Sequence, residues 1–230
     1  MSKAMAVLMT LAVAVSASAG VMYQGSLTSA DGGLVGTGAW VNPGPTTLSW
    51  VVTQDDVLGY FHYSYTMDVP VGAVSHFIVE ASPDFPEADL LNPQGPFGSI
   101  DIDTFLPGPG NEGMPDDIFG IKFDATSGTS ITIEFDTYHR PMWGDFYSKD
   151  GQAGGQGLNA VWNFGFTNPD WDPPYLYDPD ADPPVFPVPP SDGSYMYHVL
   201  VPDTVVPEPA SMALVGIGLG ALVLVRRKRV

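Results

Sequence analysis

Short runs of β-branched and aromatic residues recur along the middle of the chain, separated by Gly, Pro, Asn and Asp. The clearest is Tyr60 to Val69, in which every second residue from Phe61 to Val69 is apolar and the residues between them are polar. A period of two is that of a strand with one face in a core, so Tyr63 and Tyr65 are expected inside. Similar runs predict strands at Thr46–Thr53, Ser75–Glu80, Gly120–Asp124, Ser130–Thr137, Asp145–Tyr147, Ala160–Phe166 and Tyr195–Val201.

No helical stripe stands out between Gly20 and Asp203. About eight short strands with long Gly- and Pro-rich connections predict one all-β domain over residues 20–203, an antiparallel β-sandwich of jelly-roll or Greek-key type. A βαβ fold would need crossover helices, which this pattern lacks. Residues 82–117 and 168–192 are too rich in proline for the interior of a sheet, and we expect surface loops or edge coverings there.

The N-terminal residues have the three parts of a secretion signal. Lys3 gives a positive start, Ala4 to Val15 is apolar except for Thr10, and Ala17 and Ala19 supply a small-x-small cleavage site. The apolar run has no polar face, which argues against a buried amphipathic helix. Residues 1–19 are therefore predicted to be a signal peptide that forms a helix and is cut by signal peptidase after Ala19.

A second apolar segment lies near the C-terminus. Ala210 to Val225 contains one polar residue, Ser211, and no charge. As a helix it would reach about 24 Å, slightly short of the hydrocarbon core but workable with flanking snorkelling. The basic residues that follow would stop transfer with this end in the cytoplasm: Arg226, Arg227, Lys228 and Arg229. The segment predicts a transmembrane helix at residues 210–225, with the body outside.

A short proline motif stands directly before the apolar segment. Val206, Pro207, Glu208 and Pro209 cannot form a helix interior, because each proline lacks an amide donor and has a fixed φ. The order of motif, apolar helix and basic cluster over residues 204–230 resembles the PEP-CTERM sorting domain. That resemblance implies processing by exosortase, a transpeptidase-like membrane enzyme of Gram-negative bacteria that make extracellular polysaccharide. It implies transient anchoring in the inner membrane, then delivery to the cell surface or extracellular matrix. An ordinary single-span anchor is the alternative.

The charge lies almost entirely in the body. Only Lys122, Arg140 and Lys149 are basic there, against all of the 26 acids except Glu208, which leaves a net charge of −22. Such a surface repels phosphate backbones and argues against nucleic-acid binding. The chain has no cysteine, so disulfides, zinc-thiolate sites and thiol catalysis are excluded.

Catalytic patterns are weak in this sequence. The four histidines, His62, His76, His139 and His198, stand singly and read as structural residues. There is no G-x-S-x-G elbow, and residues 151–157 are glycine-rich without a phosphate-loop lysine. Glu80 and Glu134 could pair as in a glycosidase if the fold brought them together. We expect no catalytic residues and no cofactor.

Two ligand-binding alternatives lie mainly in the second proline-rich stretch. Alternating carboxylates there could bind calcium, although the pattern is not that of an EF-hand and solvation is the simpler reading: Asp170, Asp172, Asp178, Asp180 and Asp182. Trp171, Tyr175 and Tyr177 could stack on sugars, whereas Trp143, Phe146 and Trp162 read as core residues. We assign no metal site.

These patterns together favour an exported, non-catalytic structural or adhesion protein of the cell surface or matrix. Its expected partners are signal peptidase and an exosortase-type enzyme. The alternative is a carbohydrate-binding module of the exopolysaccharide matrix, for which extracellular polysaccharide would be the partner. A glycoside hydrolase is a distant third.

Overall fold

The computed structural model describes residues 22–55, 57–124, 126–151, 158–167 and 193–205. These ranges contain thirteen strands, three short 3-10 helices and no helix long and apolar enough to cross a membrane. The signal peptide, the sorting motif and the transmembrane helix predicted above lie outside them. The elements are β1 (Met22–Thr28), β2 (Leu34–Thr37), η1 (Gly38–Trp40), β3 (Thr47–Gln54), β4 (Phe61–Asp68), β5 (Val74–Glu80), η2 (Glu87–Asp89), β6 (Leu91–Gln94), β7 (Ser99–Phe105), β8 (Ile118–Asp124), β9 (Ser130–Thr137), β10 (His139–Gly144), β11 (Phe146–Asp150), β12 (Ala160–Asn163), η3 (Phe164–Thr167) and β13 (Val199–Val205).

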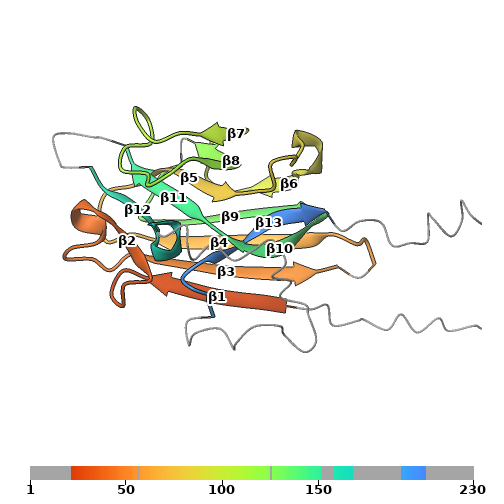
Figure 1. Ribbon diagram of the computed structural model, residues 1–230, viewed down its shortest axis with the longest axis horizontal. Helices are drawn as coiled ribbons and strands as arrows, with labels where there is room; N and C mark the ends of the chain where they lie inside the picture. Colours follow the sequence, from red (N-terminus) through yellow and green to blue (C-terminus); the bar gives the residue numbers. More distant parts are fainter. Residues whose placement is uncertain (1–21, 56, 125, 152–157, 168–192, 206–230) are drawn as a thin grey trace, which may run out of the picture.

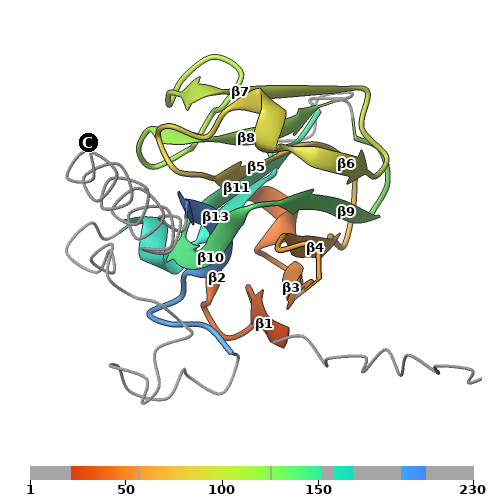
Figure 2. The same cartoon turned by 90° about the vertical axis from the view of Figure 1, so that its right-hand side faces the viewer.

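The strands form two main sheets and a two-stranded ribbon (Figures 1 and 2). One sheet has the order β1-β3-β4-β9-β6, the other has the order β2-β12-β11-β5-β8-β7, and β10 pairs with β13. Every described strand pair is antiparallel. The prediction of an all-β, antiparallel fold is therefore confirmed.

The chain crosses between the sheets as a pair of strands. In the five-stranded sheet β4 pairs with β9, and Tyr65 lies opposite Ile133. In the six-stranded sheet β5 pairs with β8, and Phe77 lies opposite Phe123. Because β5 follows β4 and β9 follows β8, the same two stretches of chain stay paired as they pass from one sheet to the other.

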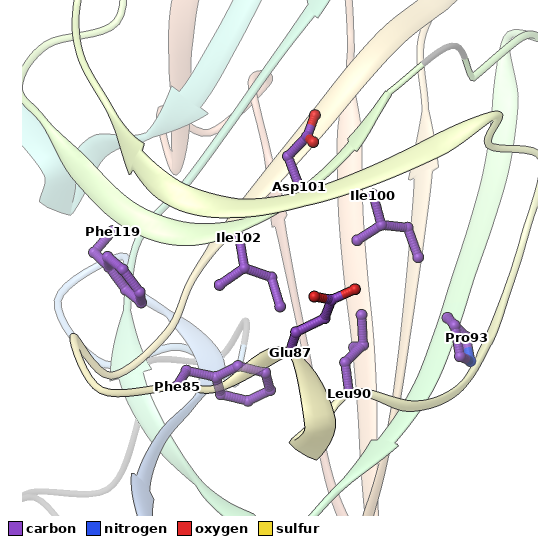
Figure 3. Close-up of a pocket in the computed structure, with 8 residues that line it drawn as sticks. All are labelled: Phe85, Glu87, Leu90, Pro93, Ile100, Asp101, Ile102 and Phe119. Carbon is purple, nitrogen blue, oxygen red and sulfur yellow. The ribbon is translucent and has the colours of Figure 1, made fainter.

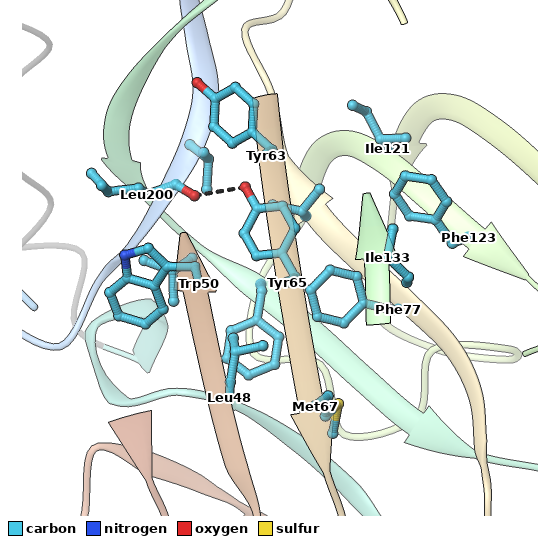
Figure 4. Close-up of a cluster of buried hydrophobic side chains, with 14 of the residues drawn as sticks. Leu48, Trp50, Tyr63, Tyr65, Met67, Phe77, Ile121, Phe123, Ile133 and Leu200 are labelled. Atoms are coloured by element: carbon cyan, nitrogen blue, oxygen red, sulfur yellow. Dashed lines mark hydrogen bonds between the residues drawn. The ribbon is translucent and has the colours of Figure 1, made fainter. Parts of the chain in front are cut away.

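The inner faces of the two sheets share one aromatic core (Figure 4). Alternation along β4 buries Phe61, Tyr63, Tyr65 and Met67 and leaves the residues between them partly exposed, as the sequence predicts. The Tyr65 ring lies 5.6 Å from the Phe77 ring of the opposite sheet, centroid to centroid. The Phe123 and Phe135 rings, also from opposite sheets, are 5.9 Å apart. Burial of these rings is the main force that holds the sheets together.

The ribbon of β10 and β13 is bonded to the tyrosines of this core. The Tyr65 hydroxyl donates to the Leu200 carbonyl at 2.7 Å, and the Tyr63 hydroxyl donates to the His139 carbonyl at 3.1 Å. Leu200 and its neighbours Val199 and Val201 are buried in the same core. These bonds fix the last described strand, and therefore its end at Val205, to the body.

Several predicted elements differ in the structure. The strand expected over Ala160–Phe166 ends at Asn163, where η3 follows, and β1, β2 and β10 were not expected. Residues 91–94 and 99–105, expected to be surface loops or edge coverings, form β6 and β7, which are the outermost strands of their sheets. An edge strand tolerates Pro93 because one side of its backbone needs no partner. The strand expected from Tyr195 begins only at Val199, because Met196 and Tyr197 have positive φ angles of 49° and 62°, which a strand does not allow.

Candidate functional site

The two ends of the described body lie at the same end of the five-stranded sheet (Figure 1). Met22 at the start of β1 pairs with Thr53, next to the turn that joins β3 to β4. Across that turn Phe61 pairs with Thr137, and two residues later His139 pairs with Val205. We call this region, made of Met22, Asp55, Val57–Tyr60, Thr137–His139 and Val205, the exit end, because the chain continues from Val205 toward the predicted sorting motif.

The exit end carries exposed apolar side chains. Val57 is 87% exposed and Leu58 is 59% exposed, and Met22 and Tyr138 of the same region are also exposed. The backbone amides of Val57 and Leu58 both donate to the Asp55 carboxylate at 2.8 Å, and Gly59 takes a φ of 75° that glycine adopts without strain. Asp55 thus holds the backbone of Val57 and Leu58, and both aliphatic side chains face solvent. The sequence signal for this turn is a pair of aliphatic residues between aspartate and glycine, directly after a strand.

A pocket of about 540 Å³ opens between η2, β6 and β7 (Figure 3). Its lining combines apolar residues with two acids, and the Glu87 carboxylate lies between Leu90 and Ile102. The other lining residues are Phe85, Pro93, Ile100, Asp101 and Phe119. The alternation of apolar and acidic residues from Ile100 to Asp103 is a signal for β7, but the neighbouring prolines favoured a loop or edge covering instead.

A serine, a histidine and an aspartate lie in a row next to Phe85, one of the pocket residues. The Ser82 hydroxyl is 3.1 Å from His139 Nδ1, and His139 Nε2 is 2.9 Å from the Asp89 carboxylate. A catalytic serine must reach a substrate carbonyl. Ser82 is only 6% exposed, and the Phe85 ring lies 4.4 Å from the imidazole, centroid to centroid. The geometry therefore favours a structural hydrogen-bonded row, buried at Ser82 and His139, that ties η2 to β10.

The other histidines have separate surroundings. His62, on the polar face of β4 as predicted, bonds through Nδ1 to Asp136 at 2.7 Å. His198 is buried, with Nδ1 3.2 Å from the Tyr195 carbonyl and Nε2 3.5 Å from the Asp145 carboxylate. His76 is buried on β5, and its Nδ1 lies 3.9 Å from Asp124. Among the described residues, no group of three or more His, Asp or Glu side chains could hold a metal ion.

The two strand glutamates lie in different sheets. Glu134 of β9 accepts a bond from the Ser64 hydroxyl at 3.2 Å, on the outer face of the five-stranded sheet. Glu80 of β5, in the six-stranded sheet, accepts a bond from the Asp145 amide at 2.7 Å. The fold does not bring them together as the acid and nucleophile of a glycosidase, which lie about 5 Å apart.

The body's two lysines are both engaged with acids. Lys122 Nζ is 2.9 Å from Asp124, and Lys149 Nζ donates to Glu112 at 2.5 Å. The bond from Lys149 lowers the pKa of Glu112 to about 2. Both pairs lie close enough to His76 to affect its pKa. Burial lowers the pKa of His76 to about 3, and the charges of Lys122 and Lys149 act in the same direction.

Only some residues of the sugar-binding and calcium-binding hypotheses lie in the described part of the chain. Phe146 is buried, and Trp143 and Trp162 are half-buried against the core clusters. Trp171, Tyr175 and Tyr177 lie outside the described residues, as do the alternating aspartates from Asp170 to Asp182.

The sorting residues also lie outside the described ranges: Ala17, Ala19, Val206, Pro207, Glu208, Pro209, Arg226, Arg227, Lys228 and Arg229. A family model, the PEP-CTERM protein-sorting motif, matches residues 205–229. Comparison with curated proteins and comparison with solved structures found no match. The match begins at Val205, the last residue of β13. The chain therefore carries a PEP-CTERM protein-sorting motif, joined directly to the last strand of an all-β body, and is an exported protein sorted by exosortase.

Proposed function

We propose that this chain is a non-catalytic structural or adhesion protein of the bacterial cell surface or extracellular matrix. The observation that carries the proposal is the sorting motif that follows the all-β body without a linker. On this proposal the C-terminal segment holds the chain transiently in the inner membrane of a Gram-negative cell. Exosortase then processes it near Pro207–Pro209, and the body is delivered outside.

Buried polar groups support the non-catalytic part of this proposal. Ser82, His139 and His198 are each less than a tenth exposed and have partners within the fold. The strand glutamates lie apart. Both lysines of the body are bound in ion pairs. Such an arrangement is what a structural role for these groups predicts.

For the body itself we infer a β-sandwich passenger domain of jelly-roll type. The paired passage of β4 with β9 and β5 with β8 between sheets supports this topology, since a jelly roll is a folded pair of antiparallel ribbons. Its polar outer surface, with a body charge of −22, keeps it soluble outside the cell.

The sorting role is tested by replacing the motif. In exosortase-positive cells we expect the wild-type chain to be inserted in the membrane and then released or transferred with a shortened C-terminus. The Pro207→Ala/Glu208→Ala/Pro209→Ala variant should insert equally well and remain intact, because the enzyme reads the extended backbone that the prolines impose. Membrane fractionation and mass spectrometry of the C-terminus distinguish the two.

A matched control changes the same residue classes elsewhere. Asp182→Ala/Pro183→Ala/Pro184→Ala also removes one acid and two prolines, outside the motif, and should be processed like the wild type. An identical intact C-terminus in all three chains would reduce the tail to an ordinary membrane anchor.

The pocket favours a second candidate, the carbohydrate-binding module. Its volume is in the range of small-ligand sites, and the Glu87 carboxylate can accept bonds from sugar hydroxyls. We then expect a neutral exopolysaccharide to bind by calorimetry, and Glu87→Gln to weaken binding about tenfold or more, as loss of a charged hydrogen bond does. Asp103→Asn, on β7 but outside the pocket lining, serves as the control. Equal affinity of both variants would remove this candidate.

A further inference from the structure

Half of the exposed large apolar side chains lie where the body meets its predicted membrane segment. Of the eight large apolar side chains exposed in the described residues, Met22, Val57, Leu58 and Tyr138 all belong to the exit end. Single exposed apolar residues are normal on a soluble surface, but a group at one end is not explained by the fold. None of the four fills a gap in the core clusters.

The length of the connecting chain limits how far this end can lie from the membrane. Only Val206–Pro209 separate Val205 from the apolar segment that begins at Ala210. From Val205 to Ala210 the chain takes five residue steps, which span at most about 18 Å when fully extended. Val205 is held to the body through its pairing with His139, so the exit end cannot move far from the bilayer while the tail is intact. Tethering at this distance gives a high effective concentration of the tip at the membrane surface.

We infer that the exit end docks on the lipid bilayer itself before the tail is cut, with Val57 and Leu58 inserted into the interface. This inference rests on the proposed sorting function, in which the chain passes through a membrane-held state. Asp55 supports the insertion by holding both amides of the turn, so no unbonded amide of Val57 or Leu58 enters the apolar region. The acidic side chain also keeps the contact shallow, because carboxylates stay at the wet edge of the interface.

The contact orients the passenger on the membrane. With Val57 and Leu58 on the lipid, the strands of the five-stranded sheet point away from the surface. The segment at Val206–Pro209 is then held at the interface, where a membrane enzyme can reach it.

The absence of cysteine allows a direct test in the full chain. Leu58→Cys carries an environment-sensitive fluorophore, and the labelled chain is placed in nanodiscs of zwitterionic lipid. We expect the label in nanodiscs to emit at shorter wavelength than the label on a chain without its tail in detergent-free buffer. We also expect spin-labelled lipid to quench the label in nanodiscs. Val71→Cys is the matched control, since Val71 is 39% exposed in the link that follows β4, at the opposite end of that strand and about 25 Å away. Its label should stay solvent-exposed and unquenched.

A second variant checks that the aliphatic tip causes the contact. The label is moved to Tyr138→Cys, which also lies in the exit end and should be quenched by lipid in the parent chain. The change Val57→Ser/Leu58→Ser should abolish this quenching and leave the circular dichroism spectrum unchanged. Quenching that persists in this variant would contradict insertion of the tip.

The remaining outcomes separate this inference from the sorting proposal. If the chain enters nanodiscs but the Leu58→Cys and Val71→Cys labels behave alike, docking on lipid is wrong while sorting stands. If the Leu58→Cys label becomes shielded only when exosortase is added, the surface binds the enzyme and not the bilayer. If the chain does not enter the nanodiscs at all, the membrane-held state fails, and both proposals fall with it.

Discussion

Replacing Tyr65 by alanine is expected to lower the free energy of unfolding by roughly 3–5 kcal/mol, the usual cost of truncating a large buried aromatic residue. Tyr65 is 2% exposed in the middle of β4. Its ring contacts Phe77 of the opposite sheet and Phe135 of the neighbouring strand, and its hydroxyl bonds the Leu200 carbonyl of β13. One substitution thus leaves a cavity between the sheets and also releases the ribbon that leads to the sorting motif. Urea denaturation of the full chain in detergent, followed by circular dichroism, measures the loss.

Two further variants divide this effect into its parts. Tyr65→Phe keeps the ring and removes only the bond to Leu200, so we expect a cost of about 1 kcal/mol. Ser64→Ala changes the polar face of the same strand, where only a bond to Glu134 is lost, and should cost well under 1 kcal/mol. A loss in Ser64→Ala as large as that in Tyr65→Ala would contradict the register of β4.

The second large effect is a loss of stability in acid that depends on His76. This imidazole is 2% exposed, and its Nε2 has no hydrogen-bond partner within the described part of the chain. Burial, followed by the charges of Lys122 and Lys149, lowers the pKa of His76 from its ordinary value of 6.5 to about 3; Asp124 and Glu112 act in the opposite direction. Between pH 6.5 and about 3, the unfolded chain therefore binds a proton at His76 that the folded chain does not bind. Stability falls as the pH drops from 6.5 toward 3, by up to about 1.4 kcal/mol for each pH unit.

The His76→Phe variant isolates this contribution. Phenylalanine keeps the ring packed beside Tyr147, which lies 5.8 Å away from the imidazole, but cannot bind a proton. Denaturation curves at several pH values should show the variant losing less stability than the wild type between pH 6.5 and about 3. Ser75→Ala, on the same strand, should keep the wild-type dependence. Glu112, with a pKa lowered to about 2, adds an acid loss below about pH 4.5 that is common to all three chains and cancels in the comparison. Parallel curves for wild type and His76→Phe would show that His76 is protonated as readily in the folded state.

Both experiments bear on the sorting segment as well as on the body. β13 is held by the core through Tyr65 and Tyr63, and it ends where the sorting motif begins. Loosening the core is therefore expected to free the residues before the motif. The membrane-docked state inferred above needs a body that stays folded up to Val205.

The sequence by itself determined the elements whose signal is local. The alternation from Phe61 to Val69 placed each side chain of β4 on its correct face, since a strand repeats every two residues and only one face enters the core. The sorting motif was readable for a similar reason. Its function depends on the order of a proline motif, an apolar segment and a basic cluster along the chain, and the family match covers those residues.

The sequence was misleading where the position of a strand in the sheet mattered more than its composition. Pro93 and the surrounding prolines argued against the interior of a sheet in residues 82–117, and surface loops or edge coverings were expected; β6 and β7 form there as edge strands, which need bonds on one side only. Tyr195 to His198 have the composition of a strand, but the chain must turn there before β13, and two positive φ angles break the run.

Contacts between distant residues were decided by the tertiary structure alone. Ser82, Asp89 and His139 form one hydrogen-bonded row, although the longest separation within it is 57 residues. Glu80 and Glu134, which the sequence left free to meet, are assigned to different sheets. The exit end is of the same kind: Met22, the Val57–Leu58 turn, Tyr138 and Val205 come from four parts of the chain. Only the pairing of β1, β3, β4, β9, β10 and β13 brings them to one end, because strand register is set by how the buried faces pack and not by any single segment.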